Sequence, residues 1–209
     1  MIRILLVDDH SIVRKGIRQI ILEEFQNAIV DEATDAETMI SKVVEQEWDL
    51  VISDVSMPGR SGLDAVAQLK KIKPRLPVLI MSIHPEDHYA VRAIKSGAAG
   101  YLSKDLAPEE LVNAVKTVLS GRKFITSVVA EKLAAMVNRD ENIAIHESLS
   151  DREFMVLKQL AKGKSITDIA ESMFLSVNTI STYRSRLMMK MDLKSNAELT
   201  LYAMEKGLI

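Results

Sequence analysis

The sequence predicts an α/β domain built on a five-stranded parallel sheet, followed by a separate all-α domain of four helices. Up to about residue 121, short apolar strand-like segments alternate with helix-patterned segments, the order found in proteins whose helices cover both faces of a parallel sheet. From Leu149 onward, apolar residues recur only at helical spacing, and tight turns separate the segments. The change in pattern indicates two domains.

Five strand-like and five helix-like segments follow one another in the first half. Apolar β-branched runs predict buried strands, and the amphipathic stretches between them predict helices. Asp35 is placed to cap the second helix, and Pro108 begins the fifth. The expected strands span 2–7, 28–33, 50–53, 77–83 and 100–102, and the expected helices span 11–24, 35–45, 62–71, 87–96 and 108–120. For a domain of this size we expect the flavodoxin-like strand order 2-1-3-4-5.

In this order the first and third strands lie side by side, and carboxylates stand at the end of both. Asp8 and Asp9 follow the first strand, and Asp54 ends the third. Open α/β sheets bind their ligands beyond the carboxyl ends of the strands, where three carboxylates repel one another unless a divalent cation lies among them. Ser82 ends the fourth strand and Lys104 follows the fifth. This set suits phosphoryl transfer to Asp54 as nucleophile, with a cation, an ammonium and a hydroxyl for the phosphoryl oxygens.

These residues together resemble the receiver domain of bacterial two-component response regulators, over about residues 1–121. The resemblance rests on the family's residues in the family's order: Asp8-Asp9, Asp54 with Met57-Pro58-Gly59 following, Ser82, Tyr101 and Lys104. It implies that a sensor histidine kinase phosphorylates Asp54, and that Ser82 and Tyr101 move together as the output switch. It also implies a Mg²⁺ ion held by Asp8, Asp9, Asp54 and the backbone carbonyl of Ser56.

Two positions near this predicted site stand apart from the common receiver pattern. Asp105 follows Lys104 where many receivers have proline, so we expect no cis-proline there. His84 lies two residues beyond Ser82, where the side chain influences phosphate lifetime in receivers. The four histidines, His10, His84, His88 and His146, lack ligand spacing, so we expect surface or hydrogen-bonding roles for them rather than metal binding.

Between the two patterns lies a polar stretch that we interpret as the domain boundary. Gly121 follows the fifth helix, and residues 127–137 then show helical spacing. Residues 138–148 are polar and lack periodicity, as expected of a linker. We therefore expect a receiver domain at 1–121, a linker with one helix at 122–148, and a second, helical domain at 149–209.

The second half predicts four short helices. Ser150 and Glu153 form a capping box at the start of the first, which ends at Gly163. Ser165 begins the second and Ser176 caps the third, over residues 177–191, while the fourth spans 196–206. Short helices separated by tight turns are typical of a helix-turn-helix bundle.

The third helix of this half can be divided into faces by turning 100° per residue. Its apolar side, which we expect in the core, carries Ile180, Tyr183, Leu187 and Met191. The opposite side carries Asn178, Ser181, Thr182, Ser185, Arg186 and Met189. Small hydroxyls and a cation can approach DNA closely and bond base edges or phosphates. An ordinary solvated face explains the pattern equally well.

From Leu149 nearly to the C-terminus, the chain resembles the LuxR-type four-helix DNA-binding domain. The matching landmarks are Leu149 to Glu153, Gly163, Ile169-Ala170, and Ser176 with Thr179-Ile180. The form ISTYRSRL resembles the BvgA/EvgA-type branch. The resemblance implies that Ser181, Thr182 and Ser185 face base edges. It places phosphate contacts at Lys164, Thr167, Tyr183, Arg184, Arg186 and Lys190, with Thr179 in the same DNA-binding set.

Composition agrees with a regulator of this kind. The 209 residues carry a net charge of −2, no cysteine and no apolar run long enough to cross a membrane, and the N-terminus is a strand rather than a signal peptide. We therefore expect a cytoplasmic protein. Residues 1–121 hold 18 acids against 14 bases, whereas residues 147–209 hold 8 against 9. The mildly basic end is the half expected to meet DNA.

A receiver joined to a LuxR-type module resembles the NarL/FixJ-type response regulators. This implies a transcription factor, not an enzyme, whose partners are double-stranded DNA, the sensor kinase, a second copy of the chain and RNA polymerase. A haloacid-dehalogenase-like phosphatase is one alternative, but it needs a second acid where this chain has Ser56. A receiver-like module used only for protein interaction is another, and the three acids and Lys104 argue against it.

Overall fold

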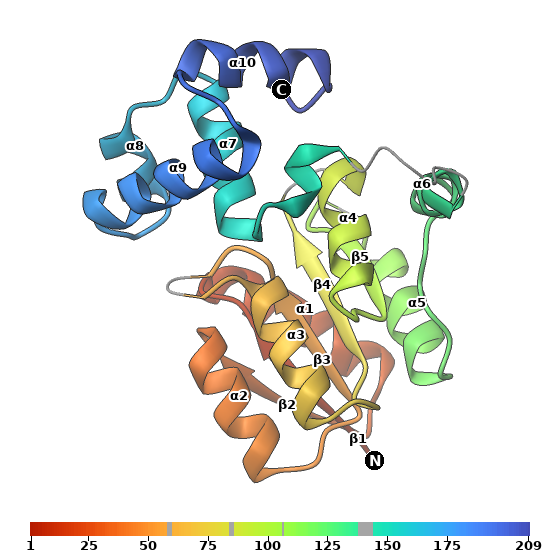
Figure 1. Cartoon of the computed structure of the whole chain (residues 1–209). Helices are drawn as coiled ribbons and strands as arrows, with labels where there is room; N and C mark the ends of the chain where they lie inside the picture. The colour runs from red at the N-terminus through yellow and green to blue at the C-terminus, as the bar shows by residue number, and fades with distance from the viewer. Residues whose placement is uncertain (58–59, 84–85, 106, 138–143) are drawn as a thin grey trace. The chain divides into compact units, whose positions relative to one another are not determined.

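The structure is a computed structural model that describes residues 1–57, 60–83, 86–105, 107–137 and 144–209. The chain forms two compact units, Met1–Asn138 and Arg139–Ile209 (Figure 1). Four of the sequence expectations lie outside what the structure describes. These are the turn at Pro58-Gly59, the position of His84, the side chain of His88, and residues 138–143 of the linker.

The first unit contains one five-stranded parallel sheet. Its strands are β1 (Ile2–Val7), β2 (Ala28–Ala33), β3 (Leu50–Asp54), β4 (Val78–Ser82) and β5 (Gly100–Ser103). They lie in the order β2-β1-β3-β4-β5, which confirms the predicted topology. Val7 is paired with Ser53 in the register of β1 and β3, so the carboxyl ends of these two strands lie side by side.

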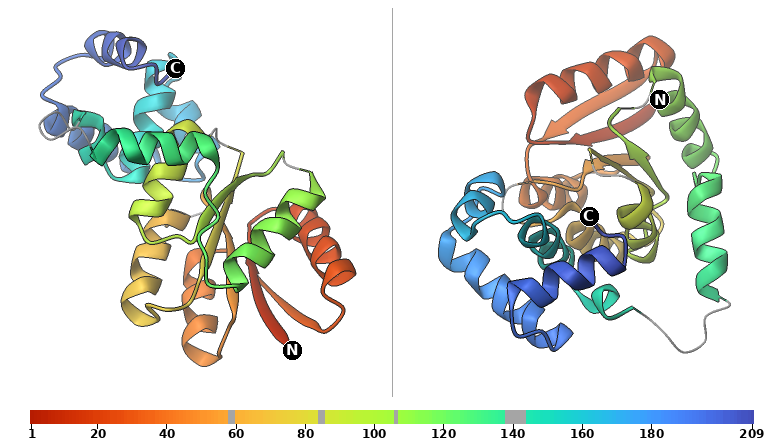
Figure 2. Two further views of the ribbon diagram at one scale, coloured as in Figure 1. Left: turned by 90° about the vertical axis from the view of Figure 1, so that its right-hand side faces the viewer. Right: turned by 90° about the horizontal axis from the view of Figure 1, so that it is seen from above.

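Helices cover both faces of the sheet (Figure 2). They are α1 (Ser11–Glu24), α2 (Ala36–Glu45), α3 (Gly62–Ile72), α4 (Glu86–Lys95) and α5 (Pro108–Leu119). One core cluster joins α1 and α5 to alternate residues of the strands, among them Ile4, Leu6 and Ile52. The strand residues between these are buried as well, as a parallel sheet covered on both faces requires. Asp35 caps α2 through a 2.8 Å bond from the backbone N–H of Thr38, as predicted.

After α5 the chain returns along the edge of the sheet. The backbone N–H of Phe124 donates to the Ala99 carbonyl at 2.8 Å, and Phe124 pairs with Gly100 of β5. A Cβ at Gly100 would lie 2.8 Å from the Phe124 carbonyl, so this close approach needs glycine. The predicted helix at 127–137 is present as α6 (Ser127–Val137), which contacts α4 within the first unit.

The second unit is helical throughout its regular elements. It contains the 3₁₀ turn η1 (Ile145–Ser148) and the helices α7 (Asp151–Ala161), α8 (Ile166–Ser172), α9 (Val177–Met191) and α10 (Asn196–Glu205). Ser150, Ser165, Ser176 and Ser195 each cap one helix by accepting a backbone N–H bond. Phe154, Ile169, Ile180, Leu187 and Leu199 are among its fully buried side chains.

Candidate functional site

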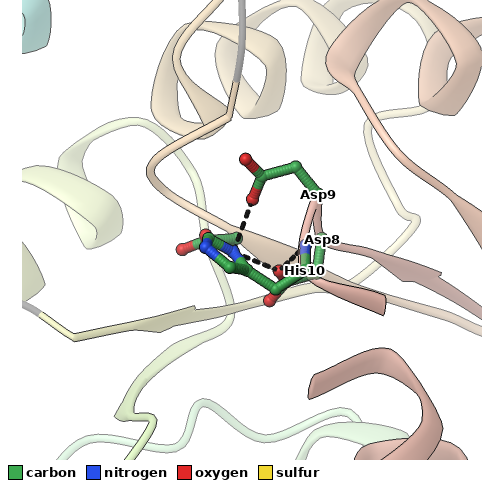
Figure 3. Close-up of side chains that lie close together, drawn as sticks. Asp8, Asp9 and His10 are labelled. Carbon is green, nitrogen blue, oxygen red and sulfur yellow. Dashed lines mark hydrogen bonds and ion pairs between the residues drawn. The ribbon is translucent and has the colours of Figure 1, made fainter. Parts of the chain in front are cut away.

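The carboxylates predicted to meet at the strand ends do meet. Asp8 and Asp54 are each only 3% exposed, and Asp9 is half-buried beside them. One ligand atom from each of Asp8, Asp9, Asp54 and His10 lies within 4.8 Å of the other three. Figure 3 shows the consecutive Asp8, Asp9 and His10, with the Asp9 carboxylate and the His10 ring close together. We call these four residues the acidic cluster.

Lys104 brings the predicted ammonium to the acidic cluster. Its Nζ lies 2.6 Å from Asp8 Oδ2 and 2.8 Å from Asp54 Oδ2, and its side chain is 8% exposed. The position is fixed by the backbone, because the Lys104 N–H donates to the Ser82 carbonyl at 2.8 Å. One ammonium is therefore shared by two buried carboxylates, and the charge of these two acids is only partly balanced.

This imbalance alters the acid–base properties of the pair. Burial raises the pKa of the Asp54 carboxyl above its ordinary value; the Lys104 ammonium opposes this without reversing it, and the Asp8 charge adds to it. Burial works in the other direction on Lys104, but the Asp54 and Asp8 carboxylates outweigh it and raise the pKa of the ammonium. Lys104 therefore stays charged, while the ionised form of Asp54 is disfavoured unless a further cation approaches.

The donor atoms of the acidic cluster fit a divalent metal ion. Asp54 Oδ1 and Asp9 Oδ1 are buried and accept no hydrogen bond. Asp9 Oδ1 lies 2.7 Å from His10 Nδ1, which is ion-pair distance without hydrogen-bond geometry. A buried acceptor without a partner costs about 1–3 kcal/mol, so these oxygens are poised for a cation. Carboxylate oxygens are also the ligands that hard divalent cations prefer.

Backbone packing holds Asp54 in place at the end of β3. The Val55 N–H donates to the Met81 carbonyl at 3.2 Å, and the Gly62 N–H donates to the Val55 carbonyl at 2.9 Å. Gly62 packs so closely that a Cβ would lie 2.0 Å from the Asp54 carbonyl oxygen. The backbone N–H of Ser56 hydrogen-bonds to the Asp54 carboxylate. Glycine at position 62 is therefore needed to place the acid.

Ser82 and Tyr101 lie where the sequence placed them. Ser82 ends β4, is fully buried, and is paired in register with Ser103 of β5. Tyr101 lies on β5, two residues before Ser103, and is 2% exposed. Tyr101 belongs to β5, the strand that leads to Lys104, and the Ser82 carbonyl at the end of β4 accepts the backbone N–H of Lys104.

In the second unit, the polar face of α9 is exposed. Asn178, Thr182, Ser185, Arg186 and Met189 are exposed, and Ser181 is half-buried. The opposite side is the core, with Ile180, Leu187 and Met191 buried as predicted. Tyr183 is only half-buried, whereas Met188, which was not assigned to the core, is 9% exposed. The edge at position 183 is therefore open to solvent.

The predicted DNA-contacting side chains differ in how available they are. Arg184 Nε donates to Asn196 Oδ1 at 3.0 Å, and Lys190 Nζ forms a 2.7 Å ion pair with Glu153 Oε2. Lys164 Nζ donates to Gln159 Oε1 at 2.8 Å. Thr167 is exposed on α8, and Thr179 is half-buried at the start of α9. Within the described part of the chain, no carboxylate lies at ion-pair distance from Arg186.

Residues 4–116 match the response regulator receiver domain family, and residues 147–203 match the LuxR family of bacterial regulatory proteins. The chain is 34% identical over its whole length to the response regulator UvrY of Escherichia coli K12, covering 96% of that protein. It is 32% identical over its whole length to the response regulator GacA of Pseudomonas aeruginosa, covering 98%. The chain belongs to the response regulators.

Solved structures of other response regulators resemble this chain. The RcsB response regulator of Salmonella typhimurium aligns with a TM-score of 0.60 at 26% identity, covering 97% of this chain and 98% of that chain. An RcsB–DNA complex aligns with a TM-score of 0.57 at 26% identity, covering 96% of each chain. These matches confirm the predicted fold class and the pairing of a receiver with a LuxR-type helix-turn-helix domain.

The family also confirms the functional class predicted for this response regulator. This chain joins a receiver domain to a LuxR-family domain, which is the composition of a transcription-factor response regulator and not of an enzyme. Within the described residues, no helix is both long and apolar enough to cross a membrane. The assignment to the BvgA/EvgA-type branch stays a prediction.

Sequence reasoning missed two residues at the acidic cluster. No ligand spacing was found for His10, yet its Nδ1 lies among the carboxylates because it directly follows Asp9. Arg14, one helical turn into α1, donates to the Asp8 carbonyl at 2.6 Å and to Glu32 Oε2 at 2.9 Å, which ties α1 to the strand ends. Adjacency to Asp9 was the available signal for His10, whereas nothing in the sequence singles out Arg14.

Proposed function

We propose that this response regulator is a cytoplasmic transcription factor in which a sensor histidine kinase phosphorylates Asp54, and that this phosphorylation controls sequence-specific DNA binding. The observation that carries the proposal is the buried Asp54 carboxylate. One of its oxygens has no hydrogen-bond partner, and the other lies 2.8 Å from Lys104 Nζ. A free oxygen beside a fixed ammonium is what a phospho-accepting carboxylate needs.

Each residue of the site has a distinct proposed role. Asp54 attacks the phosphorus atom of the donor, and the bond from phosphorus to the donor atom breaks. Lys104 ion-pairs with one phosphoryl oxygen and Ser82 hydrogen-bonds to another. Asp8, Asp9, Asp54 and the Ser56 carbonyl hold Mg²⁺, which supplies charge neutralisation for the phosphoryl group. Because Lys104 already contacts Asp8 and Asp54, it has to move only a short distance to meet the new group.

The proposed output begins with Lys104 and the strand that leads to it. A phosphoryl group adds about −1.5 to −2 units of charge at Asp54 and draws Ser82 and Lys104 toward it. Tyr101, on the strand before Lys104, shifts with them as the switch. The change redistributes conformations that already exist, and it favours a homodimer that presents two α9 helices to half-sites about one helical turn of DNA apart. RNA polymerase is the proposed further partner at the promoter.

The proposed domain limits are 1–121 for the receiver, 122–148 for a linker that contains α6, and 149–209 for DNA binding. On the DNA-binding domain, Ser181, Thr182 and Ser185 are proposed to face base edges. Phosphate contacts are proposed for Lys164, Thr167, Tyr183, Arg184, Arg186 and Lys190, with Thr179 beside them. Since Arg184 and Lys190 already have partners on α10 and α7, binding through them requires those contacts to open or to be shared.

The test is labelling of the full chain with acetyl phosphate and Mg²⁺, read by intact-mass spectrometry. We expect one phosphoryl group on the wild type and none on Asp54→Asn. Asp105→Asn, which removes an exposed carboxylate next to Lys104, should be labelled like the wild type. Equal labelling of wild type and Asp54→Asn would overturn the assignment of the acceptor.

DNA binding gives the second arm of the test. Duplexes selected from random oligonucleotides serve as the probe, and fluorescence anisotropy measures affinity with and without beryllofluoride. Beryllofluoride with Mg²⁺ should tighten binding by the wild type and leave Asp54→Asn unchanged. A wild type whose affinity ignores beryllofluoride would show that the acidic cluster does not control the DNA-binding domain.

A further inference from the structure

A pocket of about 390 Å³ lies at the edge of the sheet opposite the acidic cluster. Because the five strands are parallel, their amino ends share this edge, where the N-terminus is labelled in Figure 1. The pocket is lined there by Asp49 before β3, Pro77 before β4 and Ala99 before β5. Pockets that bind small molecules usually measure about 300–1,000 Å³, so this one is large enough to hold a ligand.

Four cations from three segments of the chain line this pocket. They are Lys70 of α3, Arg75 before β4, and Arg122 and Lys123 after α5. Among the described residues of the lining, Asp49 is the one acid, and its Oδ2 accepts a backbone N–H at 2.8 Å. Across the described part of the chain, no carboxylate lies at ion-pair distance from any of the four cations. The pocket therefore carries a positive charge that these residues do not neutralise.

Backbone hydrogen bonds fix the segment that carries two of these cations. The Arg122 N–H donates to the Thr117 carbonyl at 3.3 Å, which closes the last turn of α5. Two residues further on, the Phe124 N–H donates to the Ala99 carbonyl at 2.8 Å, just before β5. Lys123 lies between these two anchors. The exposed Arg122 and Lys123 side chains therefore start from a backbone that is held against the edge of the sheet.

The half-buried Lys70 is held by the turn that leads to β4. Its Nζ donates to the Leu76 carbonyl at 2.6 Å and to the Pro74 carbonyl at 3.4 Å. An ammonium has three N–H donors, so one is left for a ligand. Burial lowers the pKa of the Lys70 ammonium below its ordinary value, and the charge of Lys123 adds to this effect. The two ammonium groups therefore repel each other, and an anion between them would remove that repulsion.

Two guanidinium and two ammonium groups together suit phosphate. An arginine pairs with two phosphate oxygens at once, and a lysine acts as a compact point charge. A ligand with two linked phosphates has enough charge and enough oxygens to meet cations on three segments. We propose that this pocket binds a small molecule through a diphosphate group, which is either free pyrophosphate or part of a nucleotide. The inference goes beyond the proposed function, since the acidic cluster lies at the opposite edge of the sheet.

The test is isothermal titration calorimetry on the full chain, with inorganic pyrophosphate as the probe. EDTA in the buffer removes divalent ions, which would otherwise carry pyrophosphate to the acidic cluster. We expect the wild type to bind pyrophosphate at one site. Lys123→Gln and Arg75→Gln should each weaken this binding at least about tenfold, the loss expected for one charge-assisted hydrogen bond. Both side chains are exposed, so these variants keep the fold.

Two controls separate a built site from diffuse attraction between charges. Lys71→Gln removes an exposed cation next to Lys70 that lies outside the described lining of the pocket. It should leave the affinity for pyrophosphate within about twofold of the wild type. Citrate, a multiply charged carboxylate, should bind the wild type more weakly than pyrophosphate does. No binding of pyrophosphate, an equal loss in Lys71→Gln and Lys123→Gln, or citrate binding as tight as pyrophosphate binding would overturn the proposal.

ADP as a second probe distinguishes the two sources of the diphosphate group. Tighter binding of ADP than of pyrophosphate supports a nucleotide, whose organic part then meets the rest of the lining. Weaker binding of ADP supports free pyrophosphate. Either result keeps the diphosphate site, provided that Lys123→Gln weakens the binding of the tighter probe.

The outcome is independent of whether the phosphorylation proposal holds. Asp54→Asn should bind pyrophosphate like the wild type, because Asp54 lies at the other edge of the sheet. Labelling of Asp54 by acetyl phosphate in a chain that does not bind pyrophosphate would remove only the role of this pocket. A chain that binds pyrophosphate through Lys123 but is never labelled would keep the pocket and lose the phospho-acceptor role.

Discussion

A buried carboxylate that lacks a full set of partners should lower the stability of the protein. Burial and Asp8 disfavour the charge on Asp54, so replacing the acid by its neutral amide should help the fold when no divalent cation is present. Asp54→Asn should increase the free energy of unfolding by about 1 kcal/mol in EDTA. Urea unfolding followed by the fluorescence of Trp48, the one tryptophan, measures this in the first unit.

Lys104→Met is the control for Asp54→Asn and should change the free energy of unfolding in the opposite direction. The ammonium is the counter-charge of two buried acids, and removing one member of a buried ion pair costs about 3–5 kcal/mol. Mg²⁺ should restore part of this loss, because a cation can replace the ammonium. If Asp54→Asn proves less stable than the wild type in EDTA, the carboxylate is better satisfied than its contacts indicate.

Glycine 62 allows a second test at the scale of one residue. A methyl group there would meet the backbone oxygen of Asp54 at 2.0 Å, and backbone cannot yield as a flexible side chain can. Gly62→Ala should destabilise the first unit by about 2 kcal/mol. It should also reduce labelling of Asp54 by displacing the carboxylate.

Gly16→Ala is the matched control for that change. Nothing lies within 4 Å of a Cβ at Gly16, which is exposed within α1. Alanine there should stabilise the unit by about 0.5–1 kcal/mol, because it removes the entropic cost of a helical glycine. Urea unfolding of both variants measures the pair, and equal effects would mean that position 62 is not tightly packed.

The central residues of the site could be predicted because parallel strands end at one edge. Once the order 2-1-3-4-5 was expected, Asp8 and Asp54 had to be neighbours, and Lys104 had to follow the last strand into the same space. The contact of the His10 ring with Asp9 could not be predicted in this way, because it depends on a side-chain rotamer at a turn, which periodicity does not encode.

At the scale of elements, the start of α7 combines a cap with an ion pair. The Ser150 N–H donates to Glu153 Oε2 at 2.8 Å, and Lys190 of α9 contacts the same oxygen at 2.7 Å. Burial works against the charge on Glu153, but Lys190 and Ser150 outweigh it and hold the pKa of this carboxyl below its ordinary value. The contact therefore joins α7 to α9 only while Glu153 is ionised.

The sign of the pH dependence follows from this lowered pKa. Ionised Glu153 stabilises the fold above the ordinary glutamate pKa, and the contribution is lost as the pH falls through the lower pKa of the folded state. Glu153→Gln should cost about 0.5–1 kcal/mol at pH 7, a modest amount because Lys190 is 42% exposed. The difference from wild type should vanish in strongly acidic buffer.

Urea unfolding followed by far-UV circular dichroism, at pH 7 and in acid, measures this difference in the free energy of unfolding. Glu171→Gln is the control, since Glu171 is exposed on α8 and should show no pH-dependent effect. A penalty for Glu153→Gln that persists unchanged in acid would mean that shape, not charge, matters at this position.

Helix starts were largely predictable, because a capping side chain and its partner lie close in sequence. The box at Ser150 was recognised from its glutamate, whereas the box of Ser165 and Asp168 was not, since it uses an aspartate. Tyr183 was assigned to the core by the 100° rule but is half-buried, and Met188 is buried. The 100° rule gives the direction in which a side chain points. It does not show how far the neighbouring helices extend to cover that side chain.

At the scale of the whole molecule, the division into two units followed from the change in hydrophobic pattern. That pattern did not show to which of the two units α6 belongs. Its apolar spacing predicted a helix, but only the pairing of Phe124 with Gly100 and the contact with α4 place it in the first unit. Both depend on tertiary contacts between residues more than 20 positions apart, which local pattern cannot reveal.

The mildly basic stretch at residues 147–209 leads to a last prediction, for the complete regulator on DNA. Among the α9 cations, Arg186 is exposed, and no carboxylate in the described part of the chain pairs with it, so it can release a counterion by binding a phosphate. Arg186→Ala should weaken binding to all DNA sequences and reduce the salt dependence of log K by about one ion. Lys190→Ala should change the slope less, since its ammonium already pairs with Glu153. Lys206→Ala, at the exposed end of α10, is the control and should change neither quantity. Anisotropy titrations across a range of salt concentrations measure all three, and an unchanged slope for Arg186→Ala would mean that α9 presents an ordinary solvated face.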